Sequence, residues 1–261
     1  MENTPLTGAQ LKEWGKLKHA KHRQVAGLLL VEGKKTVVEL LKSEVAVIAL
    51  LCTDTAREKY GAELQSSATD KTPLFRIGEK QFAALSQEVN SEGIIAVANA
   101  PFIPAQAISW DGLGKSVILL QNISDPGNLG AIIRSALWFS FDAIISGDNS
   151  VSAGNHKVIK ASVGGLFHLP IYEGANFSKL IPSLLAQDYA VIAGMPSGGK
   201  PPRKQEGKIA LLFGSEAHGL HKEMLPLVSE RWSIGGTGKI DSLSLPQAAA
   251  IMMYACRYGS F

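Results

Sequence analysis

The C-terminal half of the chain repeats one pattern, in which an apolar strand-like run is followed by a helical segment. Strands separated by crossover helices favour a parallel sheet, because a tight turn cannot connect two parallel neighbours. The predicted strands are Val117–Leu120, Ala143–Ile145, Ala190–Ala193, Ile209–Phe213 and Trp232–Ile234, with helices near 129–140, 176–187 and 219–227 and a last helix from Pro246. Ligands of such sheets gather at the carboxyl ends of the strands, where this chain has polar, glycine-bearing loops.

The N-terminal third alternates strand-like and helical runs of its own. Strands are predicted at Leu28–Val31, Val45–Cys52 and Gly93–Ala98, with helices between them, and the stretch Pro73–Ile77 precedes a short helix that ends at Leu85. These runs predict a small α/β domain of roughly 70 residues from Leu28, an ordinary size for a folding unit, preceded by a basic N-terminal helix. Proline and glycine then interrupt the pattern at Pro101, Pro104, Gly112 and Gly114. We therefore expect a domain over 1–100, a linker over 101–114 and a second domain over 115–261.

Composition excludes several classes of protein. Hydrophobic residues make up 46% and charged residues 19% of the chain, as in globular proteins rather than disordered ones. The N-terminus is polar and basic, unlike a signal peptide, and apolar runs such as Val45–Cys52 are too short to cross a bilayer. Cys52 and Cys256 lie far apart in apolar or helical settings, which favours buried thiols in a reducing compartment. A soluble, cytoplasmic protein is expected.

Positive charge is concentrated at the N-terminus, although the net charge of the whole chain is only +3. Such a cluster suits a phosphate backbone, and it also suits an ordinary solvated helix face. The sequence leaves both interpretations open. The cluster comprises Lys12, Lys16, Lys18, Lys21, Arg23, Lys34 and Lys35, with His19 and His22 among them.

The first polar loop of the C-terminal half, Gln121–Arg134, follows the strand predicted at Val117–Leu120. Asp125 and Pro126 indicate a helix start, since aspartate caps free amides and proline tolerates the first helical position. The start of a helix attracts anions, and Arg134 could reach a phosphate bound there. An ordinary strand-to-helix crossover with Arg134 in a surface ion pair is the alternative.

Two further loops, Phe213–Leu220 and Ile234–Leu245, also follow predicted strands. Neither contains a phosphate-binding loop or a dinucleotide fingerprint, and the chain lacks the Gly-x-Ser-x-Gly signature of serine hydrolases. His218 and His221 could share a helix face as metal ligands. No further ligand follows at a useful spacing, so we expect surface or capping histidines and no metal site.

Together the three loops resemble the motifs of the SpoU/TrmH family of RNA ribose 2′-O-methyltransferases, within the SPOUT superfamily. The resemblance covers residues 116–258, and the N-terminal domain looks like the ribosomal-protein-like substrate-binding domain common beside it. The matching residues are Asn122, Asp125 through Gly130 and Arg134 in the first motif, Phe213 through Glu216 with Gly219–Leu220 in the second, and Ile234 through Leu243 with Ala248–Ala250 in the third.

This resemblance implies an α/β fold whose C-terminal parallel sheet contains a deep trefoil knot, which general rules of chain connection disfavour. It also implies a homodimer with the active site at the subunit interface, and S-adenosylmethionine as the methyl donor. Carried over to this sequence, the donor contacts are Gly214, Ile234 and Leu243. The residues around the reacting ribose are Arg134, Asn128, Glu216, Ser242 and Ser244, the last standing where the family has asparagine.

The resemblance predicts a SAM-dependent enzyme that methylates a ribose 2′-hydroxyl of structured RNA, with ribosomal RNA favoured over transfer RNA. RNA suits this chemistry because DNA has no 2′-hydroxyl. Arg134 would grip a phosphate and stabilise the developing alkoxide, while Asn128 and Glu216 hold Arg134 and the loop in register. Since a serine has shorter reach than asparagine, Ser244 also admits an alternative: a weakly active or inactive knotted protein for RNA binding or ribosome assembly.

Overall fold

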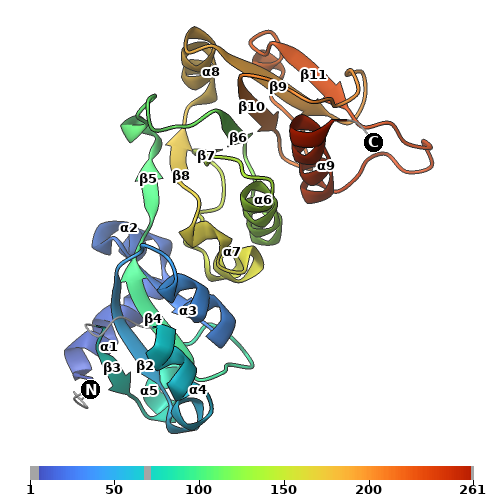
Figure 1. Cartoon of the computed structure of the whole chain (residues 1–261). Coiled ribbons are helices and arrows are strands. Elements are labelled where there is room, and N and C mark those ends of the chain that lie inside the picture. The colour runs from blue at the N-terminus through green and yellow to red at the C-terminus, as the bar shows by residue number, and fades with distance from the viewer. Residues whose placement is uncertain (1–5, 68–71, 260–261) are drawn as a thin grey trace. The chain divides into compact units, whose positions relative to one another are not determined.

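The computed structural model describes residues 6–67 and 72–259, which form two compact units (Figure 1). One unit contains the stretch that ends at Pro101 together with Gly154–His168, and the other contains Phe102–Ala153 and the chain from Leu169 onward. A short piece of the C-terminal half therefore belongs to the first unit. No pattern in the sequence indicates this, because it depends on contacts between distant parts of the chain.

The first unit is built on a mixed sheet with strand order β1-β4-β2-β3, in which β4 is antiparallel to both of its neighbours. The strands are β1 (Leu28–Glu32), β2 (Val47–Cys52), β3 (Leu74–Arg76) and β4 (Ile94–Asn99). β1, β2 and β4 coincide with predicted strands, and β3 lies in the stretch Pro73–Ile77, which was not predicted as a strand. The helices are α1 (Gly8–Gly15), α2 (Ala20–Ala26), α3 (Lys34–Leu41), α4 (Asp54–Ser67), α5 (Glu79–Leu85) and α7 (His156–Ser162), with short 3₁₀ turns at η1 (Lys16–Lys18) and η3 (Gly165–Phe167).

The basic N-terminal segment forms α1, η1 and α2 rather than one continuous helix. Trp14 and Leu17 are buried in the core of the first unit, whereas α2 contains no buried residue. The guanidinium of Arg23 donates to the carbonyl oxygens of Leu17 and Lys18 at 3.1 and 3.0 Å. Arg23 therefore holds α2 against the preceding turn, and the other basic side chains of the segment are left at the surface.

The second unit is a seven-stranded sheet with order β11-β9-β10-β6-β7-β8-β5, and each recorded strand pair in it is parallel. This confirms the predicted parallel core. The strands are β5 (Phe102–Pro104), β6 (Ser116–Leu120), β7 (Ala143–Gly147), β8 (Ile171–Ala175), β9 (Tyr189–Met195), β10 (Lys208–Phe213) and β11 (Glu230–Ser233). Sequence patterns missed β5 and β8, which are short and pair with each other at this edge of the sheet.

Helices cover both faces of the parallel sheet: α6 (Pro126–Trp138), α8 (Phe177–Ala186) and α9 (Leu245–Tyr258). Ile181 and Leu184 of α8 pack in one core cluster with Val117 and Leu119 of β6. On the opposite face α6 packs against α9. A Cβ atom on Gly194 would lie 2.7 Å from the Phe213 ring and 3.2 Å from the sulfur of Met252 in α9, so this face leaves no room for a side chain at position 194.

The helix predicted over 219–227 is wrong, because only the 3₁₀ turn η4 (Lys222–Met224) forms there. Gly219 has a φ of +63°, outside the right-handed helical region, and Pro226 lacks an amide hydrogen.

The range expected to be a linker contains the 3₁₀ turn η2 (Ala105–Ala107). Over the described ranges, no helix is long and apolar enough to cross a membrane.

Candidate functional site

Three polar loops leave the carboxyl edge of the parallel sheet, after β6, β10 and β11. β6 and β10 are hydrogen-bonded neighbours, and β9 separates β10 from β11. Because all these strands run in the same direction, their loops emerge at one edge of the sheet. The structure thus brings the three loops that stand out in the sequence to the same end of one unit.

The first loop leads into α6, whose start agrees with the prediction. Asp125 is the N-cap, its carboxylate accepts the backbone N–H of Asn128 at 2.8 Å, and Pro126 occupies the first turn. The turn before it is held by Ile123, whose N–H donates to the Ser150 hydroxyl at 3.2 Å. Arg134 is exposed, and its side chain makes no hydrogen bond or ion pair with any residue in 6–67 or 72–259. Its guanidinium is therefore available for an anion from outside the chain.

The second loop turns back on itself directly after β10. Gly214 is buried, and a Cβ atom placed on it would lie 2.2 Å from backbone atoms of Gly219. Ser215 and Gly219 form an isolated bridge, and the N–H of His218 donates to the Ser215 hydroxyl at 3.2 Å. The carboxylate of Glu216 lies at the exposed tip of this turn.

The first and second loops are joined by His221, at the start of η4. Its backbone N–H donates to the side-chain oxygen of Gln121 at 2.9 Å, and its Nε2 lies 2.9 Å from the amide nitrogen of Asn122. The predicted helix face that would have paired His218 with His221 does not form. Within the described residues, no group of three or more His, Cys, Asp or Glu side chains could hold a metal ion.

The third loop, after β11, is the most exposed part of the edge. Ile234 is half-buried, whereas the side chains of Ile240 and Leu243 are 71% and 40% exposed. Ser242 is exposed as well. Ser244 is the N-cap of α9, and its hydroxyl lies 3.0 Å from the side-chain oxygen of Gln247 in a capping box. Local helix capping thus engages this serine.

A fourth segment at this edge, the connection from β9 to β10, was missed by the sequence analysis. Gly199 and Lys200 run beside β11: the Lys200 N–H donates to Arg231 at 2.8 Å, and Ser233 donates to the Lys200 carbonyl at 3.0 Å. The sequence signal for this loop is the run Pro196–Gly199, which contains two glycines and directly follows β9.

Glu230 of β11 fastens this connection through its carboxylate. The Arg203 guanidinium, the Lys200 ammonium and the Trp232 indole N–H all donate to it, with the ion pairs at 2.8 Å. The Glu230 side chain is only 14% exposed. These donors lower the pKa of Glu230 to about 2. The bond from Arg203 is the largest cause, and the bonds from Lys200 and Trp232 lower the pKa further.

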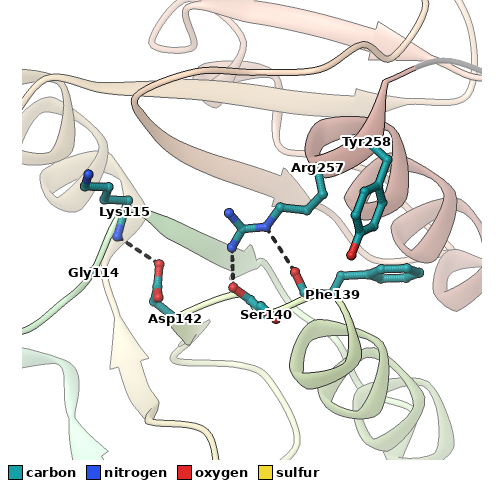
Figure 2. A pocket seen from close by; sticks show the side chains of 7 residues that line it. All are labelled: Gly114, Lys115, Phe139, Ser140, Asp142, Arg257 and Tyr258. Atoms are coloured by element: carbon teal, nitrogen blue, oxygen red, sulfur yellow. Dashed lines mark hydrogen bonds between the residues drawn. The ribbon is translucent and has the colours of Figure 1, made fainter.

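A cavity of about 570 Å³ lies at the opposite end of the strands (Figure 2). Its polar groups bond to one another: the Asp142 carboxylate accepts the N–H groups of Lys115 and Ser116 at 2.8 Å, and the Arg257 guanidinium donates to the Phe139 carbonyl at 3.0 Å and to the Ser140 carbonyl. Arg257 ties the C-terminal end of α6 to α9. We therefore assign this cavity a structural role.

Cys52 and Cys256 are both buried, as predicted. Burial raises the pKa of each thiol to about 11, which keeps both protonated near neutral pH. Neither side chain belongs to the three loops. Nucleophilic cysteine chemistry therefore has no support at this site.

Comparison with known proteins decides between the remaining interpretations. The model of the SpoU rRNA Methylase family matches residues 115–254, more than half of the chain. The chain belongs to the SpoU rRNA methylase family. A second family model, the MRM3-like substrate binding domain, matches residues 9–96.

Relatives of this SpoU family member match it over nearly its full length. The 23S rRNA (guanosine(2553)-2′-O)-methyltransferase RlmP of Bacillus subtilis is 28% identical over 95% of this chain and 96% of its own. The SpoU methyltransferase AviRb of Streptomyces viridochromogenes, solved in complex with AdoMet, has a TM-score of 0.82 at 23% identity, covering 95% of this chain and 97% of its own. An AdoMet-bound rRNA methyltransferase from Sinorhizobium meliloti has a TM-score of 0.78 at 22% identity, covering 97% and 95%.

As a SpoU family member the chain is an RNA 2′-O-methyltransferase, and its methyl donor is S-adenosylmethionine. The carboxyl edge suits such a donor in two ways. The turn at Gly214 has no space for a side chain because it packs against the Gly219 backbone, and this contact gives the second loop a fixed shape before a ligand binds. The partly exposed apolar side chains of Ile234 and Leu243 can pack on a flat, apolar ring.

Proposed function

We propose that the enzyme methylates the 2′-hydroxyl of a ribose in structured ribosomal RNA. The observation that carries this proposal is the unpaired, exposed guanidinium of Arg134 on the helix that starts at the sheet edge. The family model named for rRNA methylation and the full-length match to RlmP, a 23S rRNA methyltransferase, support ribosomal over transfer RNA. A reducing, cytoplasmic location fits two buried free thiols and a ribosomal substrate.

Gly214, Ile234 and Leu243 would hold the donor, through backbone groups of the buried turn and through apolar packing. S-adenosylmethionine supplies a methyl group activated by the positive charge on its sulfur. The main task of the protein is then to place the ribose oxygen in line with that methyl group, since positioning alone can remove much of the barrier.

Arg134 would bind an RNA phosphate beside the reacting ribose and stabilise negative charge that develops on the 2′-oxygen. A guanidinium suits both tasks because it stays protonated and presents several donors in a fixed plane. Asn128, Glu216 and Ser242 would surround the same ribose. The Ser244 hydroxyl would keep the start of α9, and with it Leu243, in place through its bond with Gln247.

We propose a homodimer in which Arg134 lies at the interface between subunits. Leu137, Trp138 and Tyr258 are 36%, 80% and 64% exposed on the paired helices α6 and α9, an unusual concentration of large apolar side chains at a surface. Arg134 and Trp138 are four residues apart on α6 and so share one face of the helix. A contact between two copies through this face would cover the apolar side chains and bring Arg134 beside the second subunit.

We also propose that the segment from β11 onward is knotted. β11 pairs with β9 on one side, and the β9–β10 connection runs along its other side at Lys200. The chain that enters β11 after β10 therefore lies between β9 and the connection that leaves β9. This arrangement supports a trefoil knot formed by threading the C-terminal segment through that connection.

The two domains are proposed to have different tasks. We propose that residues 1–100 recognise RNA, that 101–114 connect the domains and that 115–261 carry out methyl transfer. The family matches at 9–96 and 115–254 support this division. Because Gly154–His168 belongs to the first unit, the chain passes between the two units three times.

Methyl transfer to ribosomal RNA from cells that lack the protein tests the proposed function. Tritium from labelled S-adenosylmethionine should enter 23S or 16S RNA, and Arg134→Ala should abolish incorporation while calorimetry shows nearly unchanged donor binding. Mapping of 2′-O-methyl groups in the deletion strain then identifies the nucleotide. Incorporation into transfer RNA alone would contradict the ribosomal assignment, and loss of donor binding in Arg134→Ala would indicate a structural role for the arginine.

A further inference from the structure

His221 connects two loops of the site and is not among the residues proposed to contact the donor or the ribose. It follows the second loop and precedes η4, and its partners Gln121 and Asn122 lie about a hundred residues earlier in the chain. The backbone N–H of His221 binds Gln121, whose side chain is only 6% exposed and whose own N–H donates to the Phe213 carbonyl at 2.8 Å. This part of the connection is buried and belongs to the fold.

The imidazole contact is different, because it lies at the solvent-exposed side of the same turn. Asn122 Nδ2 can only donate, so with the amide nitrogen facing the ring His221 Nε2 accepts the bond at 2.9 Å. The ring hydrogen then sits on Nδ1, on the side of Glu223, whose carboxylate lies 3.8 Å away.

The residue that the imidazole holds has a left-handed backbone conformation. Asn122 has a φ of +58°, in a region that few residues other than glycine and asparagine adopt. Contacts of the neighbouring residues help to keep the turn in this conformation. Two contacts hold the turn. The Ile123 N–H donates to the Ser150 hydroxyl, and the Asn122 side chain bonds to the His221 ring.

We propose that His221 is a positioning residue for methyl transfer, which rests on the proposed function above. Its ring holds Asn122, and Asn122 lies three residues before Asp125, the cap that bonds to Asn128. Through this short stretch the ring fixes the start of α6 relative to the loop that contains Gly214 and Glu216. The histidine thereby aligns the part of the site that faces the ribose with the part that holds the donor.

Steady-state kinetics of three variants test the proposal. His221→Ala should lower kcat by ~10-fold or more, because small displacements of positioned groups cost large factors in rate. KM for S-adenosylmethionine should stay within about twofold, since the donor contacts are elsewhere. His221→Gln should recover most of the rate, because its side-chain oxygen can accept the Asn122 bond near the position of Nε2. His218→Ala is the matched control in the same loop, since the bond of His218 to Ser215 uses its backbone.

A double-mutant cycle and a measurement without substrate separate this inference from the proposed function. If His221 acts through Asn122, the pair Asn122→Ala, His221→Ala should lower kcat no further than either single change. Hydrogen exchange should speed up at the amides of 122–125 and 127–128 in His221→Ala and not in His218→Ala. If His221→Ala showed the same hydrogen exchange or the same kcat as the unmodified enzyme, the proposed role of His221 would be overturned.

If the unmodified enzyme had no methyltransferase activity, the proposed function would be contradicted. The exchange measurement would still test whether His221 fixes the turn, because it needs no substrate.

Discussion

Gly214 lies so close to Gly219 that a Cβ atom on Gly214 would be 2.2 Å from the Gly219 carbonyl group. The obstructing atoms are backbone atoms, so no rotation of a side chain can relieve the contact. Gly214→Ala should therefore open the turn, weaken S-adenosylmethionine binding at least ~10-fold, and lower the free energy of unfolding by about 1–3 kcal/mol. Calorimetry and denaturant melts measure the two effects.

The matched control for this change is Gly235→Ala, in the exposed third loop. A Cβ atom there would meet nothing within 4 Å, and the residue does not have a positive φ. Its free energy of unfolding should be unchanged. If Gly214→Ala bound the donor as tightly as the unmodified protein, the second loop would not contribute to the donor site.

Glu230 makes stability depend on acid in a defined direction. Its pKa is lowered in the folded protein to about 2, with Arg203 as the largest cause. The ionised Glu230 therefore adds its full share to the free energy of unfolding above the ordinary glutamate pKa. This share is lost as pH falls from about 5 to about 2, because over that range Glu230 is protonated in the unfolded chain but still ionised in the folded protein. Allowing for solvent screening, the full share amounts to ~2 kcal/mol of unfolding free energy.

Urea melts from pH 7 to pH 2 check this expectation. Glu230→Gln should be less stable than the unmodified protein at pH 7, and the difference should shrink toward pH 2. Glu206→Gln is the control, because Glu206 is an exposed residue of the same unit without an ion pair among the described residues. It should change neither the free energy of unfolding at pH 7 nor its dependence on pH. A constant difference between Glu230→Gln and the unmodified protein at all pH values would show that the ion pairs with Lys200 and Arg203 contribute nothing.

Trp138 tests the proposed dimer. Placing a charge on this exposed face with Trp138→Glu should convert a dimer into monomers, because the charge would be desolvated at the contact. Light scattering after size-exclusion chromatography measures the mass directly. Leu185→Glu, at a 38%-exposed leucine on α8, is the control and should leave the mass unchanged. A monomer in the unmodified protein would exclude this dimer under the conditions used.

Local signals account for the elements that the sequence predicted correctly. Asp125 and Pro126 determine the start of α6 with their own atoms, and the apolar run Val117–Leu120 is buried on both faces as part of a parallel sheet. Fold class and helix starts can be read from neighbouring residues in such cases. The three motif loops reach one sheet edge for the same reason, since each follows a parallel strand.

Contacts between distant residues explain what the sequence could not reveal. The sequence analysis placed a helix in the interval 219–227, but Gly219 and the bonds of His221 to residues 121–122 impose a turn instead. The apolar pattern of β8 is interrupted by Glu173 and Gly174, and the strand is stabilised by its pairs with β7 and β5. The contact between His221 and Asn122 bridges 99 positions, so it has no local signature.

Lys21 provides a test of RNA binding by the first unit. It is exposed on α2, a helix without a buried residue, whereas Arg23 of the same helix is engaged with the carbonyls of Leu17 and Lys18. A helix that contributes so little to the core and carries positive charge is suited to a phosphate backbone. Lys21→Glu should therefore weaken RNA binding without affecting the donor.

The dependence of RNA affinity on salt gives the sharpest readout for Lys21. Loss of one phosphate contact should reduce the slope of log K against log salt concentration by ~0.7–0.9, whatever the RNA sequence. Lys80→Glu, an equal change of charge at an exposed lysine of α5, is the control for a general effect of net charge. Equal weakening by both changes would show that α2 makes no specific contact. A reduced slope in Lys21→Glu alone would place the RNA on α2, because counterions are released only where a lysine meets a phosphate.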